Sequence, residues 1–265
     1  MATVAVGSML REWREDRRRS QLDLSLDVGV STRHLSYVET GKSKPSPELV
    51  LALAEHLDVP LRERNALLVA AGYAPRYRQT PLDDDAMSAV RAALEQLVQA
   101  HDPYPAVVVD RRWDVMLANT GAMTFLDGVA PHLLGPPLNV YRATLHPDGM
   151  ARRIRNLTEW AYHLLAVLDR QVVLTRDPQL VELLAEVSTY PAVAALDGAW
   201  RTRGEQPAVI VPLRLATGTG DVVQSWFSTN TSIGTPVDIT LDELHVELFH
   251  PADEATAAAV GGRTA

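Results

Sequence analysis

Apolar residues recur at helical spacing through the first 72 residues, and glycine, serine or proline interrupts them at short intervals. An apolar residue every three or four positions is typical of amphipathic helices, and the interrupting residues are those that cap or break them. The pattern predicts five short helices, at residues 8–18, 21–28, 32–40, from 46 to the break at Pro60, and at 61–71. So many short helices in succession predict an all-α bundle with its own small core.

The pattern changes after residue 72. Residues 75–85 are polar, contain proline and lack a period, which predicts a linker. An amphipathic helix is then predicted at 87–100, longer helices at 149–168 and 178–187, and β-prone runs at 106–110, 114–119, 208–217, 221–232 and 244–249. Strands at both ends with helices between them predict an α+β fold with an antiparallel sheet. We therefore expect two domains, at 1–74 and 86–252, with the linker at 75–85 and a disordered tail at 253–265.

The second and third helices are joined by a tight turn. Ser20 and Ser31 stand where N-caps are expected, and Gly29 supplies the left-handed conformation that a sharp turn between helices needs. The apolar positions of the third helix face inward, which leaves Thr32, Arg33, Ser36 and Tyr37 pointing outward. A capped helix that presents such side chains, preceded by a bracing helix, can reach base edges in the major groove of DNA.

Residues 8–72 resemble the helix-turn-helix of the Xre family, which is related to the lambda repressor and Cro proteins. The positions that match the spacing of this family are Gln21, Leu24, Gly29, Val30, Ser31, Leu35, Ser36, Glu39, Gly41 and Pro45. Ser25 departs from the usual alanine, and its hydroxyl is expected to bond back to a carbonyl one turn earlier. The resemblance also implies a structural ion pair between Arg14 and Glu39.

The resemblance implies roles in binding DNA. The position of Gln21 contacts a phosphate, the outward residues of the third helix meet base edges, and the loop after it contacts phosphates. Arg33 can make two hydrogen bonds to guanine, and His34 lies near the backbone. The predicted DNA-contacting residues are Gln21, Ser31, Thr32, Arg33, His34, Ser36, Tyr37, Lys42, Ser43 and Lys44.

The second domain resembles the MmyB-like ligand-binding domain, which has a PAS-like fold. The resemblance is carried by the run from His101 to Ala106, by 109–111, 113–114 and 118–119, and by the later runs 234–236 and 241–244. It implies an apolar, fatty-acid-like ligand, whose anionic head group could meet an arginine near the start of the helix at 149–168. The candidate ligand contacts are Trp113, Phe125, Tyr141, Arg152, Arg155, Trp160, His163 and Trp226, and ordinary core packing is the alternative for each aromatic residue.

Composition and charge exclude several classes of site and function. The net charge is −8, but residues 1–80 carry 12 Lys and Arg against 10 Asp and Glu, so the acidity lies in the second domain, away from the predicted DNA contacts. The absence of cysteine excludes disulfides and thiolate metal sites, and no apolar run of 18 residues predicts a membrane span. No metal site, cofactor motif or nucleophile with a base at an interpretable spacing is found, so we expect neither an enzyme nor a metal site. Cytoplasmic residence is the default expectation.

These observations predict a sequence-specific transcription regulator that binds a double-stranded DNA operator as a homodimer. Two copies would contact half-sites one helical turn apart, about 34–36 Å, or a multiple of it. A small, apolar effector in the second domain would control binding, and no membrane partner is expected. The alternative is a DNA-binding regulator whose second domain serves only dimerisation or partner-protein binding, without a small-molecule ligand.

Overall fold

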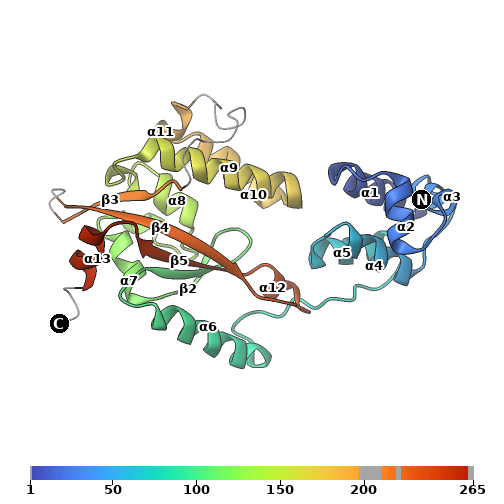
Figure 1. Cartoon of the computed structure of the whole chain (residues 1–265), viewed down its shortest axis with the longest axis horizontal. Helices are drawn as coiled ribbons and strands as arrows, with labels where there is room; N and C mark the ends of the chain where they lie inside the picture. Colours follow the sequence, from blue (N-terminus) through green and yellow to red (C-terminus); the bar gives the residue numbers. More distant parts are fainter. Residues whose placement is uncertain (1, 197, 199–209, 219–221, 262–265) are drawn as a thin grey trace. The chain divides into compact units, whose positions relative to one another are not determined.

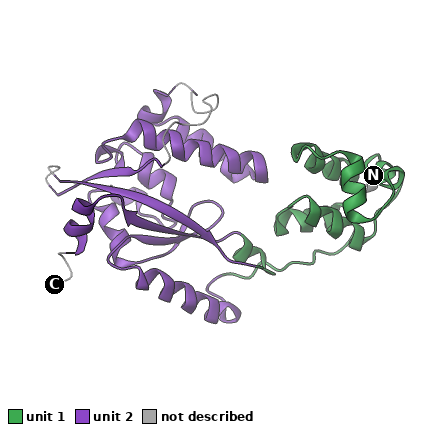
Figure 2. Ribbon diagram, in the orientation of Figure 1, with its two compact units in different colours: residues 1–81, 235–242 green, residues 82–234, 243–265 purple. Residues whose placement is uncertain are grey.

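The computed structural model describes residues 2–196, 198, 210–218 and 222–261, which form two compact units (Figures 1 and 2). Unit 1 contains residues 1–81 and 235–242, and unit 2 contains the remaining residues. The sequence prediction of an all-α unit followed by an α+β unit is confirmed. The predicted linker at 75–85 is divided between the units, with residues 75–81 in unit 1 and 82–85 in unit 2. Two other differences from the prediction, at 235–242 and at the C-terminal end, are described below.

Five helices form the body of unit 1: α1 (Ala2–Asp16), α2 (Gln21–Val28), α3 (Thr32–Glu39), α4 (Pro47–His56) and α5 (Leu61–Ala70). The side chains of Ser20, Ser31 and Ser46 each accept a hydrogen bond from a backbone N–H in the first turn of the helix that follows. Gly29, at φ 73°, ends α2 in the left-handed conformation that the sequence predicted. A shared core of aliphatic residues, with Trp13 at its edge, holds the helices together.

The segment 235–242 was expected in the second domain, but it packs in unit 1. It contains the short helix α12 (Ile239–Asp242), and Ile239 is buried. The backbone N–H of Leu61 donates to Asp242 Oδ2 at 3.0 Å, and the Thr80 hydroxyl donates to Asp238 Oδ2 at 2.7 Å. The correction has a physical reason: α5 begins after Pro60, which has no side-chain acceptor, and Asp242 supplies the missing cap from a distant part of the chain.

Unit 2 is built on a five-stranded antiparallel sheet in the order β2-β1-β5-β4-β3. Its strands are β1 (Ala106–Val109), β2 (Val115–Ala118), β3 (Leu213–Thr217), β4 (Val222–Ser232) and β5 (His245–Pro251). The predicted hairpin of β1 and β2 is present, so the antiparallel sheet is confirmed. Residues 208, 209 and 221 of the predicted third and fourth strands lie outside the described residues.

Helices cover both faces of the sheet (Figure 1). After the turn Asp85–Met87, α6 (Ser88–Ala100) packs on β1 and β2. Against the opposite face lie α7 (Thr120–Met123), α8 (Val140–Leu145), α9 (Leu157–Thr175), α10 (Pro178–Ser188) and α11 (Pro191–Ala194), together with 3-10 turns at Thr124–Leu126, Pro131–Leu133 and Met150–Arg152. The predicted helix at 149–168 is therefore wrong in its first turns. Arg153 explains the break, because its guanidinium donates to the carbonyl oxygens of Phe125 and Ala216 and holds this stretch out of helical geometry.

The predicted disordered tail is also corrected. Glu254–Gly261 forms helix α13, and the side chain of Val260 is buried. Asp253 Oδ1 accepts the backbone N–H of Thr256 at 2.7 Å, and the Thr256 hydroxyl oxygen accepts the backbone N–H of Ser225 on β4 at 2.9 Å. These bonds cap the helix and give a backbone N–H of β4 an acceptor, so the segment is helical although its Ala-rich composition is typical of a disordered chain end. Residues 262–265 lie outside the described residues.

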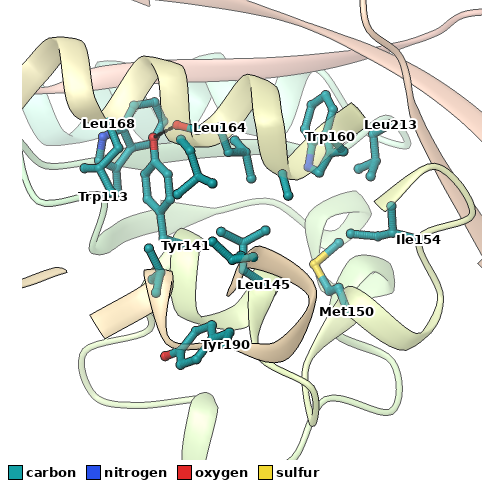
Figure 3. Packing of buried hydrophobic residues seen from close by; sticks show 14 of the residues in the cluster. Trp113, Tyr141, Leu145, Met150, Ile154, Trp160, Leu164, Leu168, Tyr190 and Leu213 are labelled. Atoms are coloured by element: carbon teal, nitrogen blue, oxygen red, sulfur yellow. Dashed lines mark hydrogen bonds between the residues drawn. The ribbon is translucent and has the colours of Figure 1, made fainter. Parts of the chain in front are cut away.

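The core of unit 2 lies between the sheet and helices α8 to α10, and Figure 3 shows part of it. Tyr141 is fully buried, and its hydroxyl donates to the carbonyl oxygen of Leu164 at 3.1 Å. Trp113 packs edge-on against Tyr141 with ring centroids 5.4 Å apart. Within the part of the chain that the structure describes, the helices are all too short or too polar to cross a bilayer.

Candidate nucleic-acid interface and ligand cavity

Helix α3 presents a set of exposed cationic and aromatic side chains. Its inward residues Leu35 and Val38 are buried in the core of unit 1, whereas Arg33 and Tyr37 are exposed one turn apart. Arg33 donates from Nε and Nη2 to the Tyr37 hydroxyl at 3.1 and 2.9 Å, and Lys42 Nζ lies 5.7 Å from the centre of the Tyr37 ring. These three residues form one surface, called here the α3 face. Arg33 keeps further donors free of this contact, because a guanidinium carries five N–H groups.

The other predicted DNA contacts surround the α3 face, and several already hold structural bonds. Ser31 Oγ accepts the backbone N–H of His34 at 3.1 Å, so the serine caps the helix. Thr32 Oγ1 lies 2.9 Å from Ser25 Oγ, whose hydroxyl donates to the Leu22 carbonyl at 2.8 Å. The expected back-bond of Ser25 is thus present.

Ser36, Ser43 and Lys44 are the remaining predicted contacts near α3. Ser36 and Ser43 are half-buried, whereas Lys44 is exposed. Lys44 Nζ lies 4.5 Å from the centre of the Tyr73 ring, and the Tyr73 hydroxyl donates to the Pro45 carbonyl at 3.0 Å. This bond ties the loop after α3 to the end of α5, so the two lysines of the loop are presented from a fixed backbone.

A buried ion pair fixes the end of α3 to α1. Arg14 donates from Nε to Glu39 Oε1 at 2.7 Å and from Nη2 to Glu39 Oε2 at 2.9 Å. The side chain of Glu39 is 1% exposed and that of Arg14 is 10% exposed. Gln21 Nε2 donates to the same carboxylate at 2.8 Å, which leaves the amide oxygen of Gln21 without a role in this cluster. The ion pair expected from the resemblance is therefore present.

The arginines before α2 have mainly structural partners. Arg17 Nε donates to the Leu57 carbonyl at 3.0 Å, at the C-terminal end of α4. Arg19 forms an ion pair with Asp27. The Arg17 contact caps the end of α4, and the Arg19 charge is neutralised by Asp27, whereas Arg18 is exposed beside them.

Unit 2 contains an apolar cavity of about 80 Å³ between the sheet and its covering helices. Its walls come from all the layers that meet there: Val107 and Val115 from β1 and β2, Phe249 from β5, Phe125 from the turn after α7, and Trp160 and Leu164 from α9. An engineered apolar cavity of about 150 Å³ binds benzene. The present cavity has about half that volume, so it fits a group smaller than benzene as it stands and a larger one when lining side chains move. Met123 lines it and is 55% exposed, so an adaptable side chain lies between the cavity and solvent.

One ionisable group, Glu247 on β5, occurs among the described residues that line the cavity. Burial raises the pKa of its carboxyl, and a hydrogen bond from the Ser228 hydroxyl acts in the opposite direction. The sequence analysis did not select this residue. The signal for it exists, because His245, Glu247 and Phe249 alternate along a strand and must share one face.

Comparisons with known proteins agree with both parts of this description. The model of the MmyB-like transcription regulator ligand binding domain matches residues 90–261, and a helix-turn-helix model matches residues 10–64. The chain belongs to the MmyB-like transcription regulators. The first match covers most of the chain and includes α13, in agreement with the place of that helix in unit 2.

Mycobacterial proteins are similar to this MmyB-like chain. The uncharacterized HTH-type transcriptional regulators Rv0023 of Mycobacterium tuberculosis and Mb0023 of Mycobacterium bovis are each 33% identical to it over 136 residues. The aligned part is 49% of this chain and 46% of each relative, so the match spans about half the length of these relatives.

The predicted ligand contacts of the MmyB-like domain fall into two groups. Phe125 and Trp160 line the cavity. Trp113 and Tyr141 belong to the packed core, where Trp113 Nε1 donates to Gln171 Oε1 at 2.6 Å. Their contacts in this structure are those of ordinary core residues, which was the alternative given for them. Trp226 borders a second, more open hollow of about 410 Å³, beside Asp102 and Thr124.

The three remaining predicted contacts, Arg152, Arg155 and His163, are exposed and do not line the apolar cavity. Arg152 lies 3.6 Å from Asp148, and the His163 ring rests against Trp160 on the outside of α9. Both arginines lie at the break around Arg153, where the 3-10 turn Met150–Arg152 and an irregular stretch stand in place of the expected helix start. No arginine or lysine occurs among the described residues that line the cavity.

Three potential metal ligands lie together on the surface of unit 2, although no metal site was predicted. Ligand atoms of His132, His146 and Asp148 lie within 4.8 Å of one another. The backbone N–H of Asp148 donates to His146 Nδ1 at 3.0 Å, so the proton of the neutral ring sits on Nε2. This arrangement leaves neither nitrogen of His146 ready to bind a metal without rearrangement. In metal sites the second ring nitrogen normally donates a hydrogen bond instead.

Proposed function

We propose that this protein is a sequence-specific, dimeric transcription regulator whose affinity for operator DNA is set by a small apolar molecule in the cavity of unit 2. The observation that carries the first part is the α3 face, an exposed Arg33, Tyr37 and Lys42 on a capped helix that a buried ion pair holds in place. The apolar cavity in the domain that belongs to the MmyB-like ligand-binding family supports the second part.

The α3 face has the chemistry that DNA reading needs. Arg33 can donate two parallel hydrogen bonds to O6 and N7 of guanine, and exchanging its bonds to Tyr37 for these costs little because the contact is exposed. Lys42 and Lys44 flank this residue on the loop after α3 and would neutralise phosphates, which positions the helix without selecting sequence. A single α3 face has few cationic side chains and would bind DNA weakly, and a homodimer would double the number of these side chains in contact with DNA.

A route from the cavity to unit 1 exists along the chain. Strand β5 contributes cavity walls, β4 pairs with it, and the chain between these strands is segment 235–242, which packs in unit 1. A ligand that shifts β5 would change the positions of Asp238 and Asp242, which accept hydrogen bonds from Thr80 and from the first turn of α5. Such a ligand controls DNA binding only if it binds two arrangements of the protein with different affinity.

The fatty-acid-like molecule implied by the family resemblance is one candidate effector, and the apolar walls support its hydrocarbon part. The alternative, a domain used only for dimerisation or for a partner protein, predicts a fully packed interior. The cavity favours the effector.

Selection of DNA from a random pool by the full-length protein tests the reading function. We expect one enriched motif with two half-sites, and we expect Arg33→Ala to weaken that motif by about 1–3 kcal/mol while relaxing selection at one base pair of each half-site. Enrichment of no motif, or a selected motif unchanged by the substitution, would contradict the proposal. Native mass spectrometry of the same sample reports the oligomeric state and any bound small molecule. A dimer that carries the extra mass of a small molecule supports an effector, whereas a dimer at the sequence mass supports the alternative. A monomer contradicts the arrangement with two half-sites.

A further inference from the structure

Glu247 occupies a position that the fold would fill with an apolar residue. Alternate residues of a strand face opposite sides of the sheet, so Glu247 shares with Phe249 the face of β5 that is turned toward the cavity. Both residues line the cavity, and the cross-strand neighbour of Glu247 on β1, Val107, lines it as well. The carboxyl group is thus placed in a wall that is otherwise built from hydrocarbon.

The protein offers this carboxyl group little compensation. Glu247 is half-buried, Ser228 on β4 is the side chain that lowers the pKa of its carboxyl, and no ion pair to Glu247 is found among the residues that the structure describes. The carboxyl of Glu247 also raises the pKa of Tyr141 on α8 electrostatically, and the Tyr141 hydroxyl already donates to the Leu164 carbonyl. An ionisable group kept in an apolar wall without a cationic partner is unfavourable for folding, and such groups are concentrated at binding sites.

We propose that Glu247 recognises a basic nitrogen, so that the effector is a small apolar amine whose ammonium group pairs with the Glu247 carboxylate while its hydrocarbon part contacts Val107, Val115 and Phe249. This inference rests on the proposed function, because it takes the cavity as the effector site. The missing cation of the wall is then supplied by the ligand. An anionic head group in the same place would set two acidic groups side by side, with no arginine or lysine among the described lining residues to separate them.

Three six-carbon probes that differ only in the head group test this inference on the full-length protein: hexylamine, hexan-1-ol and hexanoate, compared by titration calorimetry at pH 7. We expect hexylamine to bind at least about tenfold more tightly than hexan-1-ol, because a desolvated ion pair adds to the same hydrocarbon burial, and hexanoate to bind most weakly. In Glu247→Gln the advantage of hexylamine over hexan-1-ol should disappear, while the affinity for hexan-1-ol stays within about twofold.

Glu182→Gln is the matched control, because it removes the same charge from an exposed position on α10. It should leave all three affinities unchanged, which separates recognition by Glu247 from general attraction of amines to an acidic domain. Equal binding of hexylamine and hexan-1-ol, tighter binding of hexanoate, or unchanged hexylamine binding in Glu247→Gln would overturn the amine inference and leave the apolar effector in place. Absence of binding by every probe would overturn both.

Discussion

The buried ion pair between Arg14 and Glu39 holds α3, the proposed DNA-reading helix, in position, and removing Glu39 should loosen this helix strongly. In Glu39→Ala, two guanidinium donors of Arg14 and the amide of Gln21 lose their acceptors, which now lie at 2.7, 2.9 and 2.8 Å. Because the Arg14 side chain is only 10% exposed, water replaces the carboxylate poorly. Breaking a buried pair by removing one partner costs about 3–5 kcal/mol.

The whole loss should fall on unit 1. A small domain has a free energy of unfolding of about 5–15 kcal/mol, so a loss of roughly 3 kcal/mol raises the open population of α1 to α3 more than a hundredfold. Native-state hydrogen exchange of the full-length protein measures this locally, since it reports opening amide by amide. We expect faster exchange throughout α1, α2 and α3, and unchanged exchange in strands β1 and β5.

The double substitution Arg14→Met with Glu39→Leu is the control for this prediction. It removes both charges together and keeps a similar volume, and such replacements are often neutral or stabilising. We expect it to recover most of the stability lost in Glu39→Ala. A loss below about 1 kcal/mol in the single variant would refute the reasoning, because exposed pairs contribute no more than that; so would a double variant as unstable as the single one.

Three further predictions concern other parts of the molecule. Burial raises the pKa of Glu247 above its ordinary 4.5, so the folded state binds this proton more tightly than the unfolded state, and stability is lost as the pH rises through the folded pKa. In urea unfolding, Glu247→Gln should therefore be more stable than the unsubstituted protein at neutral pH. This difference should shrink toward pH 4.5, with a slope of at most about 1.4 kcal/mol per pH unit. Asp242→Ala should remove the cap of α5 at a cost of about 1 kcal/mol, seen as faster hydrogen exchange at Leu61 and unaltered exchange in α2. Lys42→Ala should weaken binding to all DNA sequences alike and lower the slope of log affinity against log salt by about 1 per copy; a change in base preference would show instead that Lys42 reads sequence, as Arg33 is expected to do.

Local patterns were enough to predict unit 1. Helices α2 to α5 each follow a serine or proline and end near a glycine or in a short turn, so their start and stop signals lie within a few residues of the elements that they define. Helix α1 is the exception, because it begins at Ala2, before the predicted start at residue 8. The outward positions of α3 follow from the same periodicity, and the exposed Arg33 and Tyr37 lie where it placed them. The tight contacts of Glu39 needed the family resemblance, because nothing local relates it to Arg14, 25 residues earlier.

Long-range contacts decided the features that the sequence did not reveal. The break before α9 depends on Arg153, whose partners lie at Phe125 and Ala216, and no pattern near residue 153 indicates them. The order of α13 depends on a backbone donor of Ser225, and the place of segment 235–242 depends on α5. Arg152 and Arg155, the arginines expected near a ligand head group, lie exposed at the same break, and their role in binding a ligand stays a prediction.

The two unexpected features lie close together in the chain, which bears on how a ligand could control DNA binding. Asp242 caps α5 of unit 1, and Glu247 reaches the cavity five residues later, with a fully buried Leu244 between them. At about 3.3 Å per residue an extended chain of this length spans no more than roughly 17 Å. Glu243 and Leu244 alone separate α12 from β5, so a ligand at Glu247 that displaced β5 would act on Asp242 through these two residues. The proposed amine and the proposed coupling therefore depend on the same strand, and Asp242→Ala should break the coupling while leaving the amine affinity intact.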